Sequence, residues 1–316
     1  MAIKSTSNAE FIRIWRIHRS GAKVAQILGM AERSALRRRR RVEEEEGVNL
    51  DAGSRHYGLN EHPSIQHLDI QNGVVLVASD CHYWPGQITT AHTVFVQMCK
   101  ELKPKAVIMN GDVVDGASIS RHPPIGWEGR PSLKEELLVC QQRLKEIEEA
   151  APNAEKLWNL GNHDGRYETR LASVASEFAE IKGMHLKDHF PKWKPAWATW
   201  INNEVVVKHR FKGGTHATHN NTLAAGKTMV TGHLHSLKVT PYSDYNGTRW
   251  GVDTGTMAPI YGPQTSDYCE TNPVNWRQGF AVLTFHKGEL LWPELVHVRA
   301  EGEFEFRGKV YKIEAV

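Results

Sequence analysis

Short apolar runs and helical stripes alternate along the middle of the chain. Five apolar runs predict buried strands at residues 74–79, 106–110, 157–160, 205–208 and 228–231. Between them, apolar residues recur at helical spacing in segments 91–102, 133–147 and 171–178. Strands that alternate with helices predict a layered α/β fold.

From about residue 260 the pattern changes to alternating apolar and polar positions. Segments 280–285 and 290–298 flank a Lys-Gly turn and predict a β-hairpin. A second strand pair is predicted within residues 302–313. We place both pairs in one domain covering residues 73–316, and interpret the polar stretch 51–72 as a linker.

Residues 1–50 show a third pattern, three short helices in succession. An apolar stripe between Phe11 and Ile17 marks the first helix, and two more are predicted at 22–29 and 31–41. A small apolar core is expected from Val24, Ile27, Leu28 and Leu36.

Two small residues suggest how these helices are joined. Ala25 lets two helices cross closely, and Gly29, four positions later, permits a left-handed turn. The segment therefore resembles a helix-turn-helix, which implies a nucleic-acid-binding element whose third helix carries the contacts. The residues expected to bind nucleic acid are Arg33, Arg37, Arg38, Arg39, Arg40 and Arg41. A helical hairpin that contacts another protein is the alternative.

The charge is unevenly distributed along the chain. Residues 1–41 contain eleven Lys and Arg against two Glu, a net charge of +9. Because the whole chain carries +3, the remaining 275 residues carry −6. A basic segment ahead of an acidic body favours a phosphate-rich partner, and DNA is the partner expected here.

Composition excludes several classes of protein. Of the 316 residues, 40% are hydrophobic and 24% charged, which is not typical of a disordered chain, a collagen or a coiled-coil rod. No apolar run is long enough to span a membrane, and no secretory signal is visible, so no membrane association is expected. Cysteines are few and widely spaced, which indicates reduced thiols and a cytoplasmic location.

Asp, Asn and His follow directly after each of the five predicted strands. These residues are Asp80, His82, Asp112, Asn162, His163, Asp164, His209, His233 and His235. Because the carboxyl ends of strands in open α/β sheets meet at one edge, we expect these side chains to converge. In extended backbone, positions i and i+2 face the same side, so Asp80 with His82 can hold one metal ion, as can His233 with His235.

The sequence Gly161-Asn162-His163-Asp164 is the most specific element. An amide oxygen is a neutral ligand, so the neighbouring imidazole of His163 can face a substrate while Asp164 holds it in one tautomer. Asp115 is interpreted as a helix N-cap, with a hydrogen-bond acceptor at the metal site as the alternative. For the fourth strand end we prefer His209, with His216 and His219 in the next loop as competitors.

Together these motifs resemble the calcineurin-like metallophosphoesterase family. They are D-x-H (80–82), G-D-x-x-D (111–115), G-N-H-D (161–164), a single His (209) and G-H-x-H (232–235). The resemblance covers residues 73–260 and implies a four-layer α/β/β/α sandwich with a two-metal site. It implies that Asp80, His82 and His235 hold one ion, that Asn162, His209 and His233 hold the other, and that Asp112 bridges them. In this chain Arg210 follows His209, where many family members have glycine.

The resemblance also implies a reaction, hydrolysis of a phosphoester by attack of a metal-bridging hydroxide on phosphorus. The mixed nitrogen and oxygen ligands suit two divalent ions, Mn first, with Fe, Zn, Co or Ni as alternatives. His163 and Asp164 are the expected catalytic residues, and Arg121 and His122 are expected to border the substrate.

The basic N-terminal segment favours a phosphodiesterase or nuclease that acts on DNA. A DNA-targeting segment on a small cytosolic hydrolase suits the cytoplasm of a bacterial cell or a phage-infected host. A phosphatase acting on phosphoproteins or small phosphomonoesters is one alternative, and a DNA-binding regulator with an inactive metal domain is another. The sequence leaves the oligomeric state open.

Overall fold

The structure is a computed structural model that describes residues 6–18, 20–48, 50, 62–122, 127, 129–261 and 272–313. The chain divides into two compact units, Met1–Leu59 and Asn60–Val316, here called the helical unit and the larger unit. Within the described residues, no helix is both long and apolar enough to cross a membrane.

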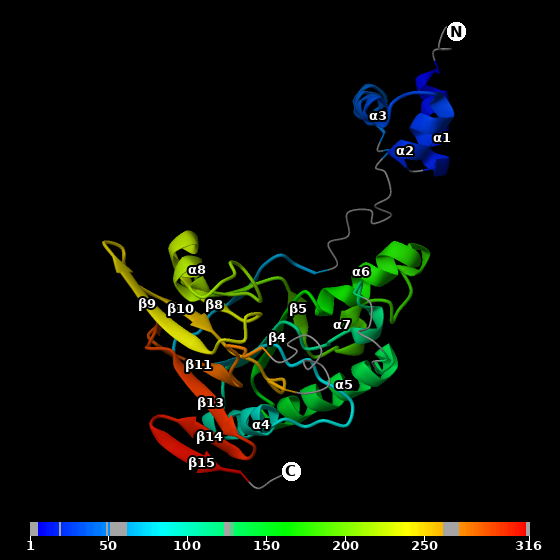
Figure 1. Ribbon diagram of the computed structural model, residues 1–316. Coiled ribbons are helices and arrows are strands. Elements are labelled where there is room, and N and C mark those ends of the chain that lie inside the picture. The colour runs from blue at the N-terminus through cyan, green and yellow to red at the C-terminus, as the bar shows by residue number, and fades with distance from the viewer. Residues whose placement is uncertain are drawn as a thin grey trace. The chain divides into compact units, whose positions relative to one another are not determined.

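Three helices form the helical unit (Figure 1), α1 (Asn8–His18), α2 (Gly21–Leu28) and α3 (Glu32–Glu46). The Ser20 side chain accepts a hydrogen bond from the Lys23 N–H and caps α2. Gly29 has a φ of 62°, and the next residue, Met30, donates its N–H to the Ala25 carbonyl. The turn between α2 and α3 therefore needs the left-handed conformation that glycine adopts without strain.

The core of the helical unit differs from the expected one. Its buried members are Phe11, Ile14, Trp15, Val24, Ala25, Ala35, Val42 and Leu50. Ile27 and Leu36 are 47% and 38% exposed, so their assignment to the core was wrong. The aromatic rings of α1 fill the space instead, because Phe11 and Trp15 are the largest apolar side chains available to three short helices.

Over the described residues, the strands of the larger unit form two sheets. Sheet A has the order β1-β6-β7-β8-β10-β9 and sheet B the order β15-β14-β13-β11-β2-β3-β4-β5, with β12 beside β11. The strands of sheet A are β1 (Gln66–Leu68), β6 (Thr199–Ile201), β7 (Val205–Val207), β8 (Thr228–Thr231), β9 (Lys238–Asp244) and β10 (Gly247–Asp253). Those of sheet B are β2 (Gly73–Ala78), β3 (Ala106–Asn110), β4 (Glu155–Asn159), β5 (Lys194–Ala196), β11 (Gly279–His286), β12 (Glu289–Leu290), β13 (Glu294–Ala300), β14 (Glu303–Phe306) and β15 (Lys309–Lys312).

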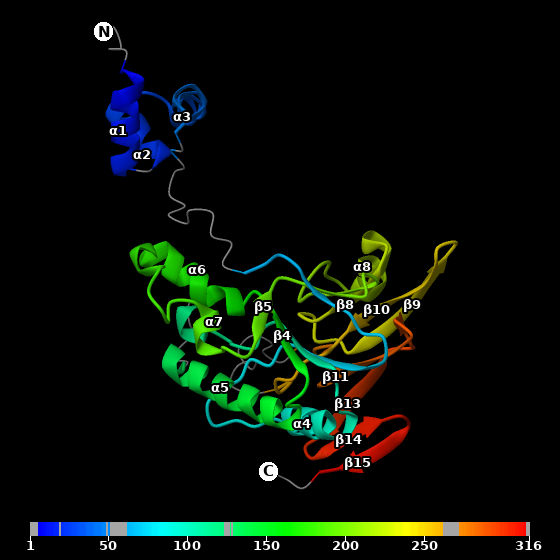
Figure 2. The same ribbon diagram turned by 180° about the vertical axis from the view of Figure 1, so that it is seen from behind.

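The two sheets lie face to face with helices outside them, as Figures 1 and 2 show. One apolar cluster joins the sheets, with Val75 and Ile108 of sheet B beside Val207 and Val230 of sheet A. Helices α4 (Thr90–Leu102) and α5 (Leu133–Ala150) pack on the other face of sheet B, and α8 (Ala217–Ala225) packs on β8, β9 and β10. The predicted four-layer α/β/β/α arrangement is confirmed.

Burial on both faces explains the strands that carry the site. Central strands β2, β3 and β4 pair in parallel, and β3 is buried at every position. This continuous apolar run is typical of parallel strands covered on both sides. The C-terminal strands join the same sheet, since β11 pairs antiparallel with β2.

Several elements were not predicted. Strand β1 lies within the stretch interpreted as a linker and pairs in parallel with β6. Helix α6 (Asp164–Val174) begins seven residues before the predicted segment 171–178, which ends in the short 3₁₀ turn η2 (Ser176–Phe178). Two other short elements, η1 (Ala117–Ile119) and α7 (Leu186–His189), complete the larger unit.

Candidate functional site

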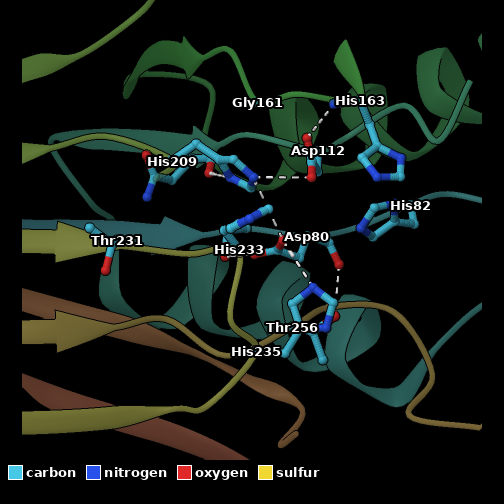
Figure 3. Close-up of polar contacts among 12 residues, drawn as sticks. Asp80, His82, Asp112, Gly161, His163, His209, Thr231, His233, His235 and Thr256 are labelled. Carbon is cyan, nitrogen blue, oxygen red and sulfur yellow. Dashed lines mark hydrogen bonds and ion pairs between the residues drawn. The ribbon is translucent and has the colours of Figure 1, made fainter. Parts of the chain in front are cut away.

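Polar side chains from both sheets meet at the carboxyl ends of the central strands (Figure 3). Asp80 and His82 follow β2, and Asp112 follows β3, all of sheet B. His209 follows β7, and His233 and His235 follow β8, all of sheet A. The structure therefore brings the side chains that follow these strands together at one edge, as predicted.

The backbone at these strand ends is not extended. Five of the residues that meet here have positive φ, namely Asp80 (55°), His82 (41°), Asp112 (53°), His233 (71°) and His235 (58°). We expected residues i and i+2 to face the same side because the backbone there would be extended. That reason was wrong, because β2 and β8 end before these residues. Left-handed non-glycine residues cost about 1–3 kcal/mol each and cluster at functional sites.

A first group of possible ligands consists of Asp80, His82 and His235. One ligand atom from each lies within 4.8 Å of the others. The Asp80 carboxylate lies 3.0 Å from His235 Nε2 through Oδ1, and its Oδ2 accepts the His233 backbone N–H at 2.8 Å. His82 Nδ1 lies 2.9 Å from Asp115 Oδ1, which leaves Nε2 of His82 for a metal ion.

A second group consists of Asp112, His209 and His233, again within 4.8 Å. His209 Nδ1 donates to the Asn110 carbonyl at 2.8 Å, so the proton-free nitrogen of the neutral ring is Nε2. That Nε2 lies 3.0 Å from Asp112 Oδ2 without forming an aligned hydrogen bond. His209 itself is almost fully buried.

The competitors of His209 lie elsewhere. His216 is exposed at the start of α8, and the ring of His219 contacts the ring of Tyr242 at 5.4 Å between centroids.

Charge at the site is balanced between carboxylates and imidazoles. Burial opposes ionisation of Asp80, but His235 and His209 lower its pKa to about 2. The pKa of Asp112 is also lowered, since His209 outweighs burial there. Against the effect of its own burial, Asp112 and Asp80 raise the pKa of His209 to about 10. Two buried carboxylates thus keep their charge and demand a positive partner.

Asn162 completes the surroundings of Asp112. Its neighbour Gly161 lies so close that a Cβ there would be 2.0 Å from Asp112 Oδ1, and the His163 N–H donates to that oxygen at 2.8 Å. Asn162 Oδ1 is buried and has no hydrogen-bond partner among the described residues. An orphaned buried amide oxygen is costly unless a ligand satisfies it.

His163 is held by Asp115 and not by Asp164. Its Nδ1 lies 2.9 Å from the Asp115 carbonyl and 3.0 Å from Asp115 Oδ1. Its Nε2 lies 3.1 Å from Arg166 Nη2. Burial disfavours the protonated ring, but Asp115 and Asp112 raise the pKa of His163 overall. The N-cap role favoured for Asp115 was therefore wrong, and the alternative acceptor role fits the contacts.

The expected contact between Asp164 and the His163 ring is absent. Asp164 is the first residue of α6 and is buried. Its carboxylate accepts from the backbone N–H groups of Asp112, Val113, Val114 and Gly161 and from Trp158 Nε1, all at 2.8–3.1 Å. Asp164 thus fixes the loop that carries Asp112, and the expectation that it orients His163 is corrected.

Arg121 and His122 are exposed and contact each other at 3.4 Å. No contact joins them to the metal-site side chains within the described residues, so their substrate role stays a prediction. Arg166 was missed by sequence reasoning. The signal was its position three residues after His163 at the start of a helix, which brings the two side chains to one face.

The six arginines of α3 divide into two sets. Arg38 donates to the Thr6 carbonyl and lies over the Phe11 ring at 4.8 Å, and Arg39 lies over the Trp15 ring at 5.6 Å. These two are half-buried and help to pack α3 on α1. The exposed set consists of Arg33, Arg37, Arg40 and Arg41, here called the arginine face. Its spacing of i, i+4, i+7 and i+8 places the four guanidinium groups along one side of the helix.

Comparison with known proteins supplies the family context. The family model described as calcineurin-like phosphoesterase matches residues 73–252. A search of curated proteins found no match.

Three solved structures show weak similarity. A Vps29 single mutant from Entamoeba histolytica is 14% identical, with 76% of this chain and 99% of that chain covered and a TM-score of 0.38. Chaetomium thermophilum Vps29 is 8% identical, with the same coverage and TM-score. A protein serine/threonine phosphatase from Saccharomyces cerevisiae, with similarity to human phosphatase PP5, is 17% identical, covers 70% of this chain and 77% of its own, and has a TM-score of 0.34.

Proposed function

Because the chain belongs to the calcineurin-like phosphoesterase family, we propose that it is a dinuclear metal-dependent phosphodiesterase that cleaves DNA. Asp80, His82 and His235 would hold one divalent ion, and Asn162, His209 and His233 the other. Asp112 would lie between them, since it is close to His209 and is wrapped by residues 161–163.

The residues present suit such ions. Asn162 Oδ1 and His209 Nε2 are buried without a hydrogen-bond partner in the described part of the chain, and a cation satisfies both. The donors are imidazole nitrogens and carboxylate or amide oxygens, a set that favours Mn, Fe, Zn, Co or Ni. When bound, two divalent cations neutralise the phosphoryl oxygens and lower the pKa of water.

His163 is the group proposed to donate a proton to the leaving oxygen. Asp115 holds Nδ1 of His163, so Nε2 is the nitrogen that presents the proton. Arg166 lies 3.1 Å from that Nε2 and is placed to bind a phosphoryl oxygen in the same position. The raised pKa of His163 supports a protonated ring near neutral pH.

The observation that carries the choice of DNA is the arginine face. Four guanidinium groups are exposed on one side of a short helix. They suit a duplex, which offers regularly spaced phosphates, better than they suit a phosphomonoester, which offers only one. Arg41 lies 3.6 Å from Glu45 in an exposed pair, which a phosphate can displace at little cost.

The test uses the purified chain, Mn²⁺ and end-labelled single- and double-stranded DNA. His163→Ala is expected to keep its metal content and to lose about 10²-fold or more in turnover. His286→Ala is the matched control, because His286 is exposed at the far end of β11, beside the start of β2. Cleavage by the wild type and the control, and not by His163→Ala, supports the proposal.

Two results would contradict it. Loss of metal from His163→Ala in step with turnover would remove the proton-donor role. DNA binding without cleavage, together with hydrolysis of a panel of phosphomonoesters, would replace the nuclease by a phosphatase.

A further inference from the structure

A long segment of the larger unit contains no acidic residue. From residue 205 to residue 243 there is no Asp or Glu, while the segment contains Lys208, Arg210, Lys212, Lys227 and Lys238. Residues 42–316 as a whole carry −6, so this segment is a local exception. It includes three of the proposed ligands, His209, His233 and His235. The stretch of chain that supplies these ligands is therefore basic.

Three of these cations lie within three residues of a proposed ligand. His209 is buried, whereas Arg210, Phe211 and Lys212 are exposed and Lys208 is half-buried. We call Lys208, Arg210, Phe211 and Lys212 the basic loop. Since the chain leaves the site at His209, every member lies within three residues of a side chain that reaches Asp112.

The basic loop is anchored at His209 and at Lys212. The His209 carbonyl accepts the Gly232 N–H at 2.9 Å, and the Lys212 N–H donates to the buried Asn221 side chain of α8 at 2.8 Å. Within the loop, the ammonium groups of Lys208 and Lys212 lie 5.3 and 5.6 Å from the centre of the Phe211 ring. The half-exposed ring thus gathers two cations on one short stretch of backbone.

These cations lack carboxylate partners. Among the described residues, no Asp or Glu pairs with Lys208, Arg210 or Lys212. By contrast, Arg307 pairs with Glu294 at 2.6 Å and Lys227 with Glu204 at 3.3 Å. Three neighbouring positive charges without a counterion repel each other and attract an anion with several charges.

We propose that the basic loop binds the phosphodiester backbone beside the scissile phosphate. This inference rests on the proposed function and adds a second contact surface, distinct from the arginine face of the helical unit. A polynucleotide offers a phosphate at every step, so neighbouring phosphates meet Lys208, Arg210 and Lys212 while one of them occupies the metal site. Because these contacts read phosphate and not bases, they are independent of sequence.

The test compares two substrates of different length. One is p-nitrophenyl thymidine phosphate, which has a single phosphodiester, and the other is octathymidylate. The double variant Arg210→Gln, Lys212→Gln is expected to lose roughly tenfold or more in kcat/KM on octathymidylate, and less than about threefold on the small diester. The slope of log kcat/KM against log salt is expected to fall by about 1.4, since each single-strand phosphate contact contributes about 0.7.

Lys227→Gln is the matched control. Lys227 belongs to the same acid-free segment but precedes β8, at the end of that strand remote from the site, and pairs with Glu204. The kcat/KM of Lys227→Gln should equal that of the wild type on both substrates.

Binding is measured separately from turnover. Fluorescein-labelled octathymidylate is titrated with the full chain in EDTA, in a background where the arginine face is changed to glutamine. Equal binding by the Arg210/Lys212 variant and its parent overturns the inference, whatever the turnover. Weaker binding by the variant supports the basic loop as a phosphate-binding surface. If binding is weaker but the wild type hydrolyses neither substrate, only the proposed function is overturned.

Discussion

Asp115 shows how a single carboxylate can organise two imidazoles. Its Oδ1 lies 2.9 Å from His82 Nδ1 and 3.0 Å from His163 Nδ1, and the two rings are 4.6 Å apart. His82 and His163 lower the pKa of Asp115 despite its burial, so it is ionised. One charged group therefore sets the orientation of a proposed ligand and of the proposed proton donor together.

Asp115→Asn tests this shared role. The amide keeps an oxygen where Oδ1 lies but removes the negative charge, so both rings lose a charged acceptor. We expect a loss of about 10–100-fold in turnover together with weaker metal binding. Steady-state kinetics and a metal titration check this, and a loss of turnover at unchanged metal affinity would show that His82 does not depend on Asp115.

Asp253, at the end of β10, gives a pH prediction that needs no substrate. Its Oδ1 accepts the N–H groups of Ser236 and Gly255, while Oδ2 is buried without a partner in the part of the chain that the structure describes. Burial raises the pKa of Asp253 to about 6, with Asp80 adding to the effect. Protonated Asp253 thus makes its full contribution to the free energy of unfolding below about pH 3.8, and this contribution is lost as pH rises through about 6.

Asp253→Asn removes this pH dependence. The amide keeps an oxygen that accepts from both N–H groups and carries no charge. The free energy of unfolding of the variant should therefore rise relative to that of the wild type as pH rises. The expected gain between pH 4.5 and 8 is on the order of 1–3 kcal/mol. Urea midpoints in EDTA measure it, and parallel pH profiles for the two proteins would refute the assignment.

At the scale of elements, close approach between strand ends shapes the site. A Cβ on Gly161, after β4, would lie 2.0 Å from Asp112 Oδ1, and one on Gly232, after β8, would lie 2.3 Å from Ser79 Oγ. Each glycine therefore lets one loop contact the residues at the end of a neighbouring element. The ligand positions depend on backbone that has no room for a methyl group.

Gly161→Ala is expected to abolish binding of the ion proposed at Asn162 and His209, because the new methyl group displaces Asp112. Gly165→Ala is its control, since a Cβ there meets only Trp197 at 3.8 Å and alanine favours the helix. Metal content after dialysis distinguishes the two variants. Full occupancy in Gly161→Ala would mean that Asp112 can move without cost.

Prediction from sequence was best where a strand is buried on both faces. The first and last residues of β3 and β8 are those of the predicted strands. These strands are buried on both faces, so their residues do not alternate between apolar and polar. Strands β9 and β10 were missed, since half-exposed positions and Pro241 hide the pattern of an edge hairpin.

The types of residue at the site were predictable, but their contacts were not. Asp164 adjoins His163 in sequence and Asp115 lies 48 residues away, yet the packing of the η1 and α6 segments brings Asp115 and not Asp164 to the ring. The positive φ values of Asp80 and Asp112 likewise follow from tertiary contacts, since neither residue type requires them.

At the scale of the molecule, two units of opposite charge share one chain. Residues 1–59 carry +5 and residues 60–316 carry −2. Within the helical unit, the acids at the end of α3 make contacts to other segments. Glu45 and Glu46 accept hydrogen bonds from Asn8 at 3.0 and 2.9 Å, and Glu43 accepts the Leu50 N–H at 2.7 Å. The acidic end of α3 therefore contributes to folding, and of these acids only Glu45 also contacts the arginine face within the part that the structure describes, through its exposed pair with Arg41.

Changing Arg33, Arg37, Arg40 and Arg41 to Gln should weaken binding to duplex DNA. The slope of log affinity against log salt is expected to fall by about 3–4, close to 0.9 for each lost phosphate contact. Arg13→Gln is the control, because Arg13 is exposed on α1 and pairs with Glu10 at 2.7 Å. Fluorescence anisotropy with labelled duplex at several salt concentrations provides the measurement, and an unchanged slope would exclude the arginine face as the DNA contact.

Both proposed ion sites take ligands from both sheets, and this has a consequence for stability. Asp80 and His82 follow a strand of sheet B while His235 follows one of sheet A, and Asp112 and His209 are divided in the same way. Bound cations would fasten the two sheets to each other at one edge, so separating the sheets would require their release. By mass action, cations at a hundredfold excess over Kd add about 2.7 kcal/mol to the free energy of unfolding. Chelation should therefore lower the Tm of the larger unit, and the melting curve would report ion occupancy without any substrate.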